Sequence, residues 1–214
     1  MVTQREVAPG LVFSDTASRF VAYLVDGFLV AIIASLLAEP FGWNAMSNAP
    51  AAQPIPIEQL LLTTEYTFLA ILVSAGYFVA FWSGGRRATP GQRIFDIQVG
   101  NAFDGQPLTT EQAVRRWLGY GEFLRLFAFT PQFVLVSGGL SLVWSIALLV
   151  STTTSPTKQG LHDRFANTAV VRPAPASSGL AYGCLLAPVV IALLAIVVLG
   201  ILSPNPGAII TGVA

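Results

Sequence analysis

The chain has 214 residues, of which 54% are hydrophobic and only 10% are charged, and its mean hydropathy is +0.67. Soluble domains carry about 25% charged residues, so a water-soluble globule of this composition would expose apolar patches that aggregate. Eleven basic and eleven acidic residues cancel, which argues against a nucleic acid partner. The expected solvent is a lipid bilayer. Cys184 and His162 are single residues of their type, which excludes an internal disulfide and multi-Cys or multi-His metal sites, and no cofactor is expected.

Four apolar regions reach or exceed the length of roughly 20 residues that a helix needs to cross a bilayer. They are Phe20–Ala38, Leu60–Trp82, Trp117–Val150 and Leu180–Leu202. The N-terminus lacks the pattern of a secretory signal, so the first region is expected to remain in the mature protein.

The third region is too long for one crossing, because a helix over all of it would measure about 50 Å. We predict a hairpin that turns near Thr130-Pro131, since proline disfavours helix at the residue before it. Its halves would be Ala113–Phe129 and Gln132–Ser151. An alternative turn at Ser137-Gly138-Gly139 would leave the second half short.

The distribution of basic residues favours this hairpin, because loops rich in arginine and lysine stay cytoplasmic. With two crossings in the third region, all loop bases fall on one side: Arg86, Arg87, Arg93, Lys158, Arg164 and Arg172. The prediction is an all-α polytopic membrane protein, a bundle of about five membrane-crossing segments with the N-terminus cytoplasmic and the C-terminus outside.

The loops on the basic side carry their own structural signals. Arg93–Val99 alternates and Thr168–Arg172 is rich in β-branched residues, so the two are expected to pair as a small cytoplasmic β element. Thr109–Gln112 is typical of a capped helix start. The predicted organisation is a membrane domain over 1–172, a linker over 173–179, and an additional C-terminal transmembrane helix with its tail over 180–214.

Ionisable residues within apolar segments are costly, so each is a functional candidate. Arg19 and Asp26 are seven residues apart and share a helix face. Asp26 lies too deep to reach water directly, and a structural hydrogen bond and a proton or cation role both stay open. Glu122 and Arg125 have the spacing of an intrahelical ion pair. Arg115-Arg116 is interpreted as a lipid-headgroup anchor.

Two loop motifs look specific. The first is the run GRRATPGQR, whose glycines permit tight turns and whose arginines could bind phosphate or a buried carboxylate; its candidates are Gly85, Arg86, Arg87, Thr89, Pro90 and Gly91. The second, GLHDRF, contains His162, Asp163 and Arg164. No nucleophile accompanies the His-Asp pair in a recognisable arrangement, so an enzyme is not expected.

These three motifs, in this order, resemble the RDD family of bacterial membrane proteins. Arg19 to Asp26 matches the family's first motif, Gly85 to Arg93 its glycine-rich loop, and Leu161 to Val171 its closing motif; Gln92 and Asn167 are mild departures. The resemblance marks Arg19, Asp26 and Asp163 and implies the inner membrane of a bacterial cell.

The resemblance also implies transport, with exchange of monovalent cations for protons reported for some members. We expect Arg19, Asp163 and the arginines of the glycine-rich loop to form one ion-pair network at the cytoplasmic face. The function hypothesis is a transport-related membrane protein, working as a homo-oligomer or as a subunit of a larger membrane complex. The alternative is a non-catalytic accessory or assembly subunit.

Overall fold

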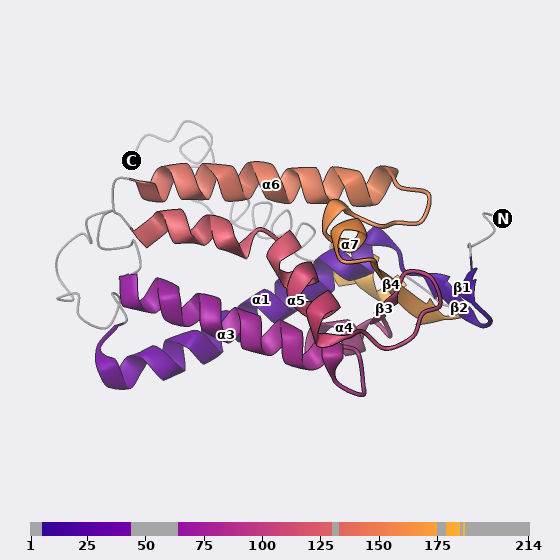
Figure 1. The fold of residues 1–214 in the computed structure, drawn as a ribbon, viewed down its shortest axis with the longest axis horizontal. Coiled ribbons are helices and arrows are strands. Elements are labelled where there is room, and N and C mark those ends of the chain that lie inside the picture. The colour runs from indigo at the N-terminus through magenta and orange to yellow at the C-terminus, as the bar shows by residue number, and fades with distance from the viewer. Residues whose placement is uncertain (1–5, 44–63, 130–132, 175–178, 185, 187–214) are drawn as a thin grey trace, which may run out of the picture.

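The structure, a computed structural model, describes residues 6–43, 64–129, 133–174, 179–184 and 186. Three long helices lie side by side, and a small sheet with the short helices lies at one end of them (Figure 1). These helices are α1 (Thr16–Ala38), α3 (Thr64–Ser83) and α6 (Val134–Thr154). In the described part of the chain, three helices are long and apolar enough to cross a membrane: Thr16–Phe41, Glu65–Ser83 and Leu135–Thr154.

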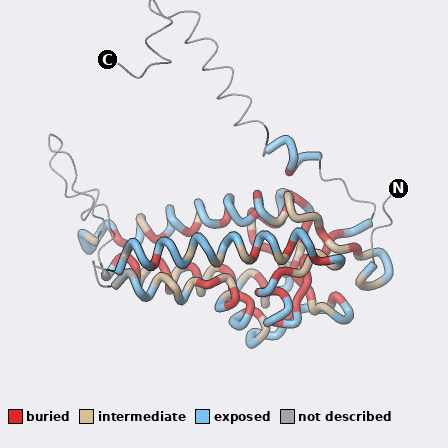
Figure 2. Tube along the Cα trace, turned by 90° about the horizontal axis from the view of Figure 1, so that it is seen from above, coloured by how far each residue is buried: buried red, intermediate tan, exposed pale blue. Residues whose placement is uncertain are grey.

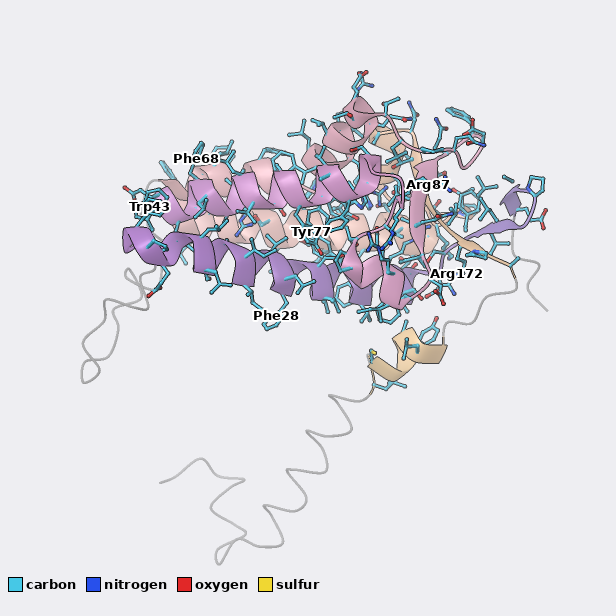
Figure 3. The ribbon with its side chains drawn as sticks, turned by 90° about the horizontal axis from the view of Figure 1, so that it is seen from below. Phe28, Trp43, Phe68, Tyr77, Arg87 and Arg172 are labelled. Atoms are coloured by element: carbon cyan, nitrogen blue, oxygen red, sulfur yellow. The ribbon has the colours of Figure 1, made fainter. Side chains whose placement is uncertain are left out.

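The outer face of the bundle is apolar, as a lipid-facing surface must be. Phe28 is 69% exposed and Phe68 is 53% exposed, and both side chains point away from the bundle (Figure 3). The burial pattern repeats along each long helix, with the exposed stripe running its whole length (Figure 2). In water this surface would be a liability, whereas lipid tails solvate it without cost.

The start of α1 and its end have local causes. Asp15 is the N-cap, and its carboxylate accepts a hydrogen bond of 2.8 Å from the Ser18 amide. A 3₁₀ turn, η1 (Glu39–Phe41), follows the helix, and Gly42 then takes a left-handed conformation with φ of 66°.

The first half of the predicted hairpin is not one continuous helix. Helix α5 (Thr110–Gly119) is followed by a break and by the 3₁₀ helix η2 (Glu122–Phe129), which packs along α6. Gly121 forms the break with φ of 87°, and a Cβ there would lie 2.3 Å from the Trp144 ring. The predicted turn at Thr130-Pro131 lies outside the described residues. The alternative turn at Ser137-Gly139 is wrong, because these residues lie inside α6.

The predicted helix start at Thr109 is confirmed. The Thr109 hydroxyl accepts from the Gln112 amide at 3.2 Å, and the Gln112 side chain accepts from the Thr109 amide at 3.1 Å. This reciprocal pair is a capping box, and it fixes which face of α5 is turned inward.

The sheet has four antiparallel strands in the order β1-β2-β4-β3. They are β1 (Glu6–Ala8), β2 (Leu11–Phe13), β3 (Gln98–Asn101) and β4 (Thr168–Pro173). The expected pairing of the two loop strands is confirmed, with Val99 opposite Val170, and the N-terminal strands were not predicted. The expected strand from Arg93 starts too early: Arg93 belongs to helix α4 (Pro90–Ile94), and Asp96 has φ of 52°.

The core lies where the sheet meets the helices. Val99, Val170 and Ile97 from the sheet end pack with Trp82 and Phe78 of α3. Helix α7 (Leu161–Phe165) precedes β4 and closes this end. The predicted linker over 173–179 and the C-terminal transmembrane helix over 180–214 lie for the most part outside the described residues.

Candidate functional site

Asp26 is a buried carboxylate on α1 that accepts three hydrogen bonds. The Tyr77 hydroxyl of α3 donates to Oδ1 at 2.8 Å, and the Gly91 amide donates to the same oxygen at 2.8 Å. The Thr89 hydroxyl donates to Oδ2 at 2.5 Å. The carboxylate is 1% exposed, so these donors replace water almost completely. Asp26 thus joins α1 to α3 and to the glycine-rich loop.

The glycine-rich loop reaches Asp26 because its residues form the start of helix α4. Thr89 is the N-cap of α4, where its hydroxyl accepts from the Gln92 amide at 3.3 Å, and Pro90 occupies the first helical position. Gly91 follows in the first turn, where a backbone amide has no intrahelical acceptor, and Asp26 accepts its hydrogen bond. A Cβ on Gly91 would lie 2.4 Å from the Ala22 carbonyl oxygen. Only glycine allows this approach.

Asp163 is the centre of a second polar cluster, at the sheet end of the bundle. Arg19 Nη1 of α1 donates to Asp163 Oδ2 at 3.0 Å, and Arg116 Nη1 of α5 forms an ion pair with Oδ1. The Gly160 amide at the start of α7 donates to Oδ2 at 3.1 Å. Asp163 and Arg116 are both 0% exposed. The predicted pairing of Arg19 with Asp163 is present.

The arginines beside Asp163 also bind the sheet and the aromatic core. Arg19 Nη2 donates to the Val170 carbonyl at 2.9 Å, which attaches α1 to β4. Arg116 donates to the Thr168 hydroxyl at 2.6 Å, and its guanidinium lies 5.0 Å from the Trp82 ring centroid. The interpretation of Arg116 as a headgroup anchor is therefore wrong. Its neighbour Arg115 is half exposed and pairs with Glu111 at 2.5 Å.

The expectation that the arginines of the glycine-rich loop join the ion-pair network of Arg19 and Asp163 is wrong. None of Arg86, Arg87 and Arg93 forms an ion pair with Asp26 or Asp163 among the described contacts; Arg87 donates instead to the Gly105 carbonyl at 2.5 Å, and Arg93 to the Ala88 carbonyl at 3.1 Å. The loop therefore binds the Asp26 carboxylate through the Thr89 hydroxyl and the Gly91 amide. Its arginines bind backbone carbonyls or lie at the surface.

The remaining candidates lie outside the two clusters. Glu122 and Arg125 form the predicted ion pair, with Arg125 Nη1 3.1 Å from Glu122 Oε2. Gly85, Arg86 and Arg164 are exposed. Sequence reasoning missed a third polar cluster, in which Arg172 of β4 donates to the Ser18 hydroxyl at 2.7 Å and pairs with Asp15.

Burial and the neighbouring charges perturb the titration of the pair in α7. Burial lowers the pKa of the His162 imidazole to about 4. The Asp163 carboxylate raises this pKa, and the Arg116 and Arg19 guanidiniums lower it. Burial alone would raise the pKa of the Asp163 carboxyl, but the Arg116 guanidinium, with His162 and Arg19, holds that pKa below its ordinary value. His162 is thus neutral, and Asp163 is ionised.

We predict that acid destabilises the protein through His162. In the unfolded chain the His162 imidazole is protonated below its ordinary pKa of 6.5, whereas in the folded chain it is protonated only below a pKa of about 4. The free energy of unfolding therefore falls as the pH falls through this window. The loss from pH 7 to pH 5 should be on the order of 2 kcal/mol. Unfolding in detergent micelles at a series of pH values measures it, and His162→Gln should flatten the profile; an unchanged slope in that variant would contradict the assignment.

A cavity of about 300 Å³ connects the two clusters. Arg19, Tyr23 and Asp26 of α1 line it together with Trp82 of α3, Arg116 of α5 and residues of α6. Tyr77 lies on the inner side of the bundle, between α1 and α3 (Figure 3). In the described residues, no group of three or more His, Cys, Asp or Glu side chains gathers as metal ligands would.

Fold and site together define a helical membrane protein in which buried carboxylates fasten the helices to a small sheet and a glycine-rich loop at one end. The chain belongs to the RDD family, whose family model matches residues 13–167. That range contains Arg19, Asp26, the glycine-rich loop and Asp163.

A curated relative is similar over a large part of the chain. An uncharacterized protein of Bacillus subtilis (strain 168), YxaI, is 23% identical over 160 residues, which covers 72% of this chain and 93% of that protein. No solved structure matches the chain.

Proposed function

We propose that this chain is a membrane transport protein that exchanges protons for monovalent cations, with Asp26 as the carboxylate that takes up and releases the proton. The observation that carries the proposal is the position of Asp26, which lies within an apolar helix and on the wall of a cavity. Ionisable groups at such positions are rare and belong to ion and proton pathways more often than to the lipid face.

The partners of Asp26 support both protonation states. The ionised carboxylate accepts from Tyr77, Thr89 and Gly91. A hydroxyl is both donor and acceptor, so after protonation the Tyr77 hydroxyl can rotate and accept the new O–H. Thr89 is less free to do so, because its oxygen already accepts from the Gln92 amide. Proton uptake then requires one rotation and no backbone movement.

The proposal includes five crossings, with the sheet end on the cytoplasmic side. In its support, α1 begins at that end, α3 and α6 finish there, and the basic loop residues follow them. A third crossing would begin at α5 and run back along α6 through η2, which packs against that helix. Trp144 of α6 donates to the Gly119 carbonyl at 3.1 Å, and Ser137 donates to the Leu124 carbonyl at 2.8 Å, as a hairpin requires. The fifth crossing would be the apolar region from Leu180.

The proposal is tested by flux in proteoliposomes that contain a pH-sensitive dye. Purified protein should move protons when a Na⁺ or K⁺ gradient is applied, and Asp26→Asn should abolish this movement at normal abundance. Asparagine preserves the size of the side chain, and its carbonyl oxygen can still accept from Tyr77 and Gly91 while its amide nitrogen takes the position that faces the Thr89 hydroxyl. Glu65→Gln is the matched control, since it makes the same change at an exposed position of α3 and should keep full flux.

A non-catalytic accessory subunit is the second candidate. The three hydrogen bonds of Asp26 favour it, because they also describe a structural clasp between α1, α3 and the loop. A protein this small offers little room for alternating access, so either function would involve an oligomer or a larger complex. A silent wild type that co-purifies in fixed ratio with other membrane proteins would favour this candidate. Neither includes an enzymatic step.

A further inference from the structure

The cavity opens between α1 and α6, on the apolar surface of the bundle. Its outer wall is formed by Leu142, Ile146 and Leu149 of α6, which are 63%, 52% and 42% exposed. The gap exists because α6 packs on η2 and α7 and touches α1 only sparsely. Exposed apolar side chains at the mouth mean that the space communicates with lipid.

The lining changes in polarity along the helix axis. Thr16 and Arg19 of α1, Thr152 of α6 and His162 of α7 line the end near the sheet. Further along, the lining is mostly apolar, with Phe20, Phe78, Leu142 and Ile146, and its polar members are Tyr23, Gln92, Ser145 and Asp26. Asp26 lies about 10 Å beyond Arg19 along α1. A molecule with a polar head toward the sheet and an apolar body toward the bilayer centre matches this order.

The polar end carries net positive charge. Arg19 and Arg116 contribute two positive charges and Asp163 one negative charge, and His162 is neutral, which leaves +1. Among the described residues, the Nε atoms of Arg19 and Arg116 have no hydrogen-bond partner, although both side chains are at least nine-tenths buried. An anionic head at this end would offset the charge.

We infer that the cavity binds an anionic phospholipid from the leaflet at the sheet end, with one acyl chain between α1 and α6 and its phosphate near Arg19. A volume of about 300 Å³ is at the lower end for ligand sites, so it holds part of one chain while the second chain stays in the bilayer. The inference does not depend on transport, because lipid binding is measured without flux.

Native mass spectrometry of the delipidated full-length protein in detergent tests the inference. Phosphatidylglycerol should bind about tenfold more tightly than phosphatidylcholine with the same acyl chains. Ile146→Trp fills the mouth of the cavity and should weaken phosphatidylglycerol binding by about tenfold or more. Val143→Trp is the matched control, because Val143 is on the same helix, is 66% exposed and does not line the cavity.

Each other outcome overturns the inference. Equal affinity for the two lipids would remove the role of the anionic head. A preference for phosphatidylglycerol that survives Ile146→Trp would assign the lipid to another basic surface, such as the exposed arginines of the glycine-rich loop. A change of oligomeric mass in Ile146→Trp, with lipid binding unaltered, would assign the groove to a second copy of the chain.

Discussion

Replacing Asp163 by asparagine should lower the free energy of unfolding by about 3–5 kcal/mol, because removal of one member of a buried ion group leaves the others uncompensated. Two guanidiniums, of Arg19 and Arg116, lose their counter-charge, and neither can move to water: the Arg116 side chain is 0% exposed and that of Arg19 is 10% exposed. The amide keeps the size of the carboxyl, so the effect reports charge. Thermal or denaturant unfolding in detergent micelles measures it.

The control for Asp163→Asn is the exposed ion pair on α5. Glu111→Gln removes the same charge from a side chain that is 70% exposed and pairs with Arg115 at 2.5 Å. Exposed pairs contribute about 1 kcal/mol or less, so this variant should unfold close to the wild type. If the two variants lose equal stability, Asp163 is not the centre that joins α1, α5 and α7.

Sequence reasoning found the carboxylates and paired Arg19 with Asp163 correctly, but it did not identify the loop residues that bind Asp26. The cost of burying Asp26 indicates that it must be paired, whereas nothing in the residue types shows that Thr89 and Gly91 reach it in place of the loop arginines. That choice depends on the close approach of Gly91 to the Ala22 carbonyl, which is a property of the packed backbone. Arginine dominates the loop sequence, but where the loop meets α1 the backbone approach at Gly91 leaves room only for small groups.

Arg116 is a case where a usable signal was present. Neighbouring residues on a helix point about 100° apart, so Arg115 and Arg116 cannot both be headgroup anchors on one face. The helix start at Thr109 fixes the phase, and Ala113, Arg116 and Gly119 then share a face, which is the buried one. What the sequence cannot provide is the partner, because Asp163 lies 47 residues further along the chain.

The fold was predictable where the apolar segments are long, and less so for short strands and for the break in the third apolar region. Helices α1 and α3 follow from their apolar length, and the β3–β4 pair from its β-branched residues. Strands β1 and β2 have three residues each, which is too short for a periodic signal. The break in the third apolar region lies at Gly121, which has a left-handed conformation and packs against the Trp144 ring where another residue would carry its Cβ.

Gly91→Ala should destabilise the protein by about 3 kcal/mol, since it adds the cost of overpacking to the loss of a hydrogen bond to a charged group. The new Cβ would lie 2.4 Å from the Ala22 carbonyl oxygen and 2.9 Å from Asp26 Cγ, so the loop must move away from α1. The movement separates the Gly91 amide from Asp26 and draws Thr89 with it. Unfolding in micelles measures the stability, and hydrogen exchange of the Gly91 and Gln92 amides should report faster opening.

Gly85→Ala is the matched control, because a Cβ at Gly85 of the same loop meets nothing within 4 Å. It should leave both stability and amide protection near those of the wild type. The comparison separates the close packing of loop against helix from any general need for a flexible glycine. If both substitutions act alike, loop flexibility is what matters; if only Gly91→Ala weakens the protein, the glycine is required because the backbone itself binds the buried carboxylate.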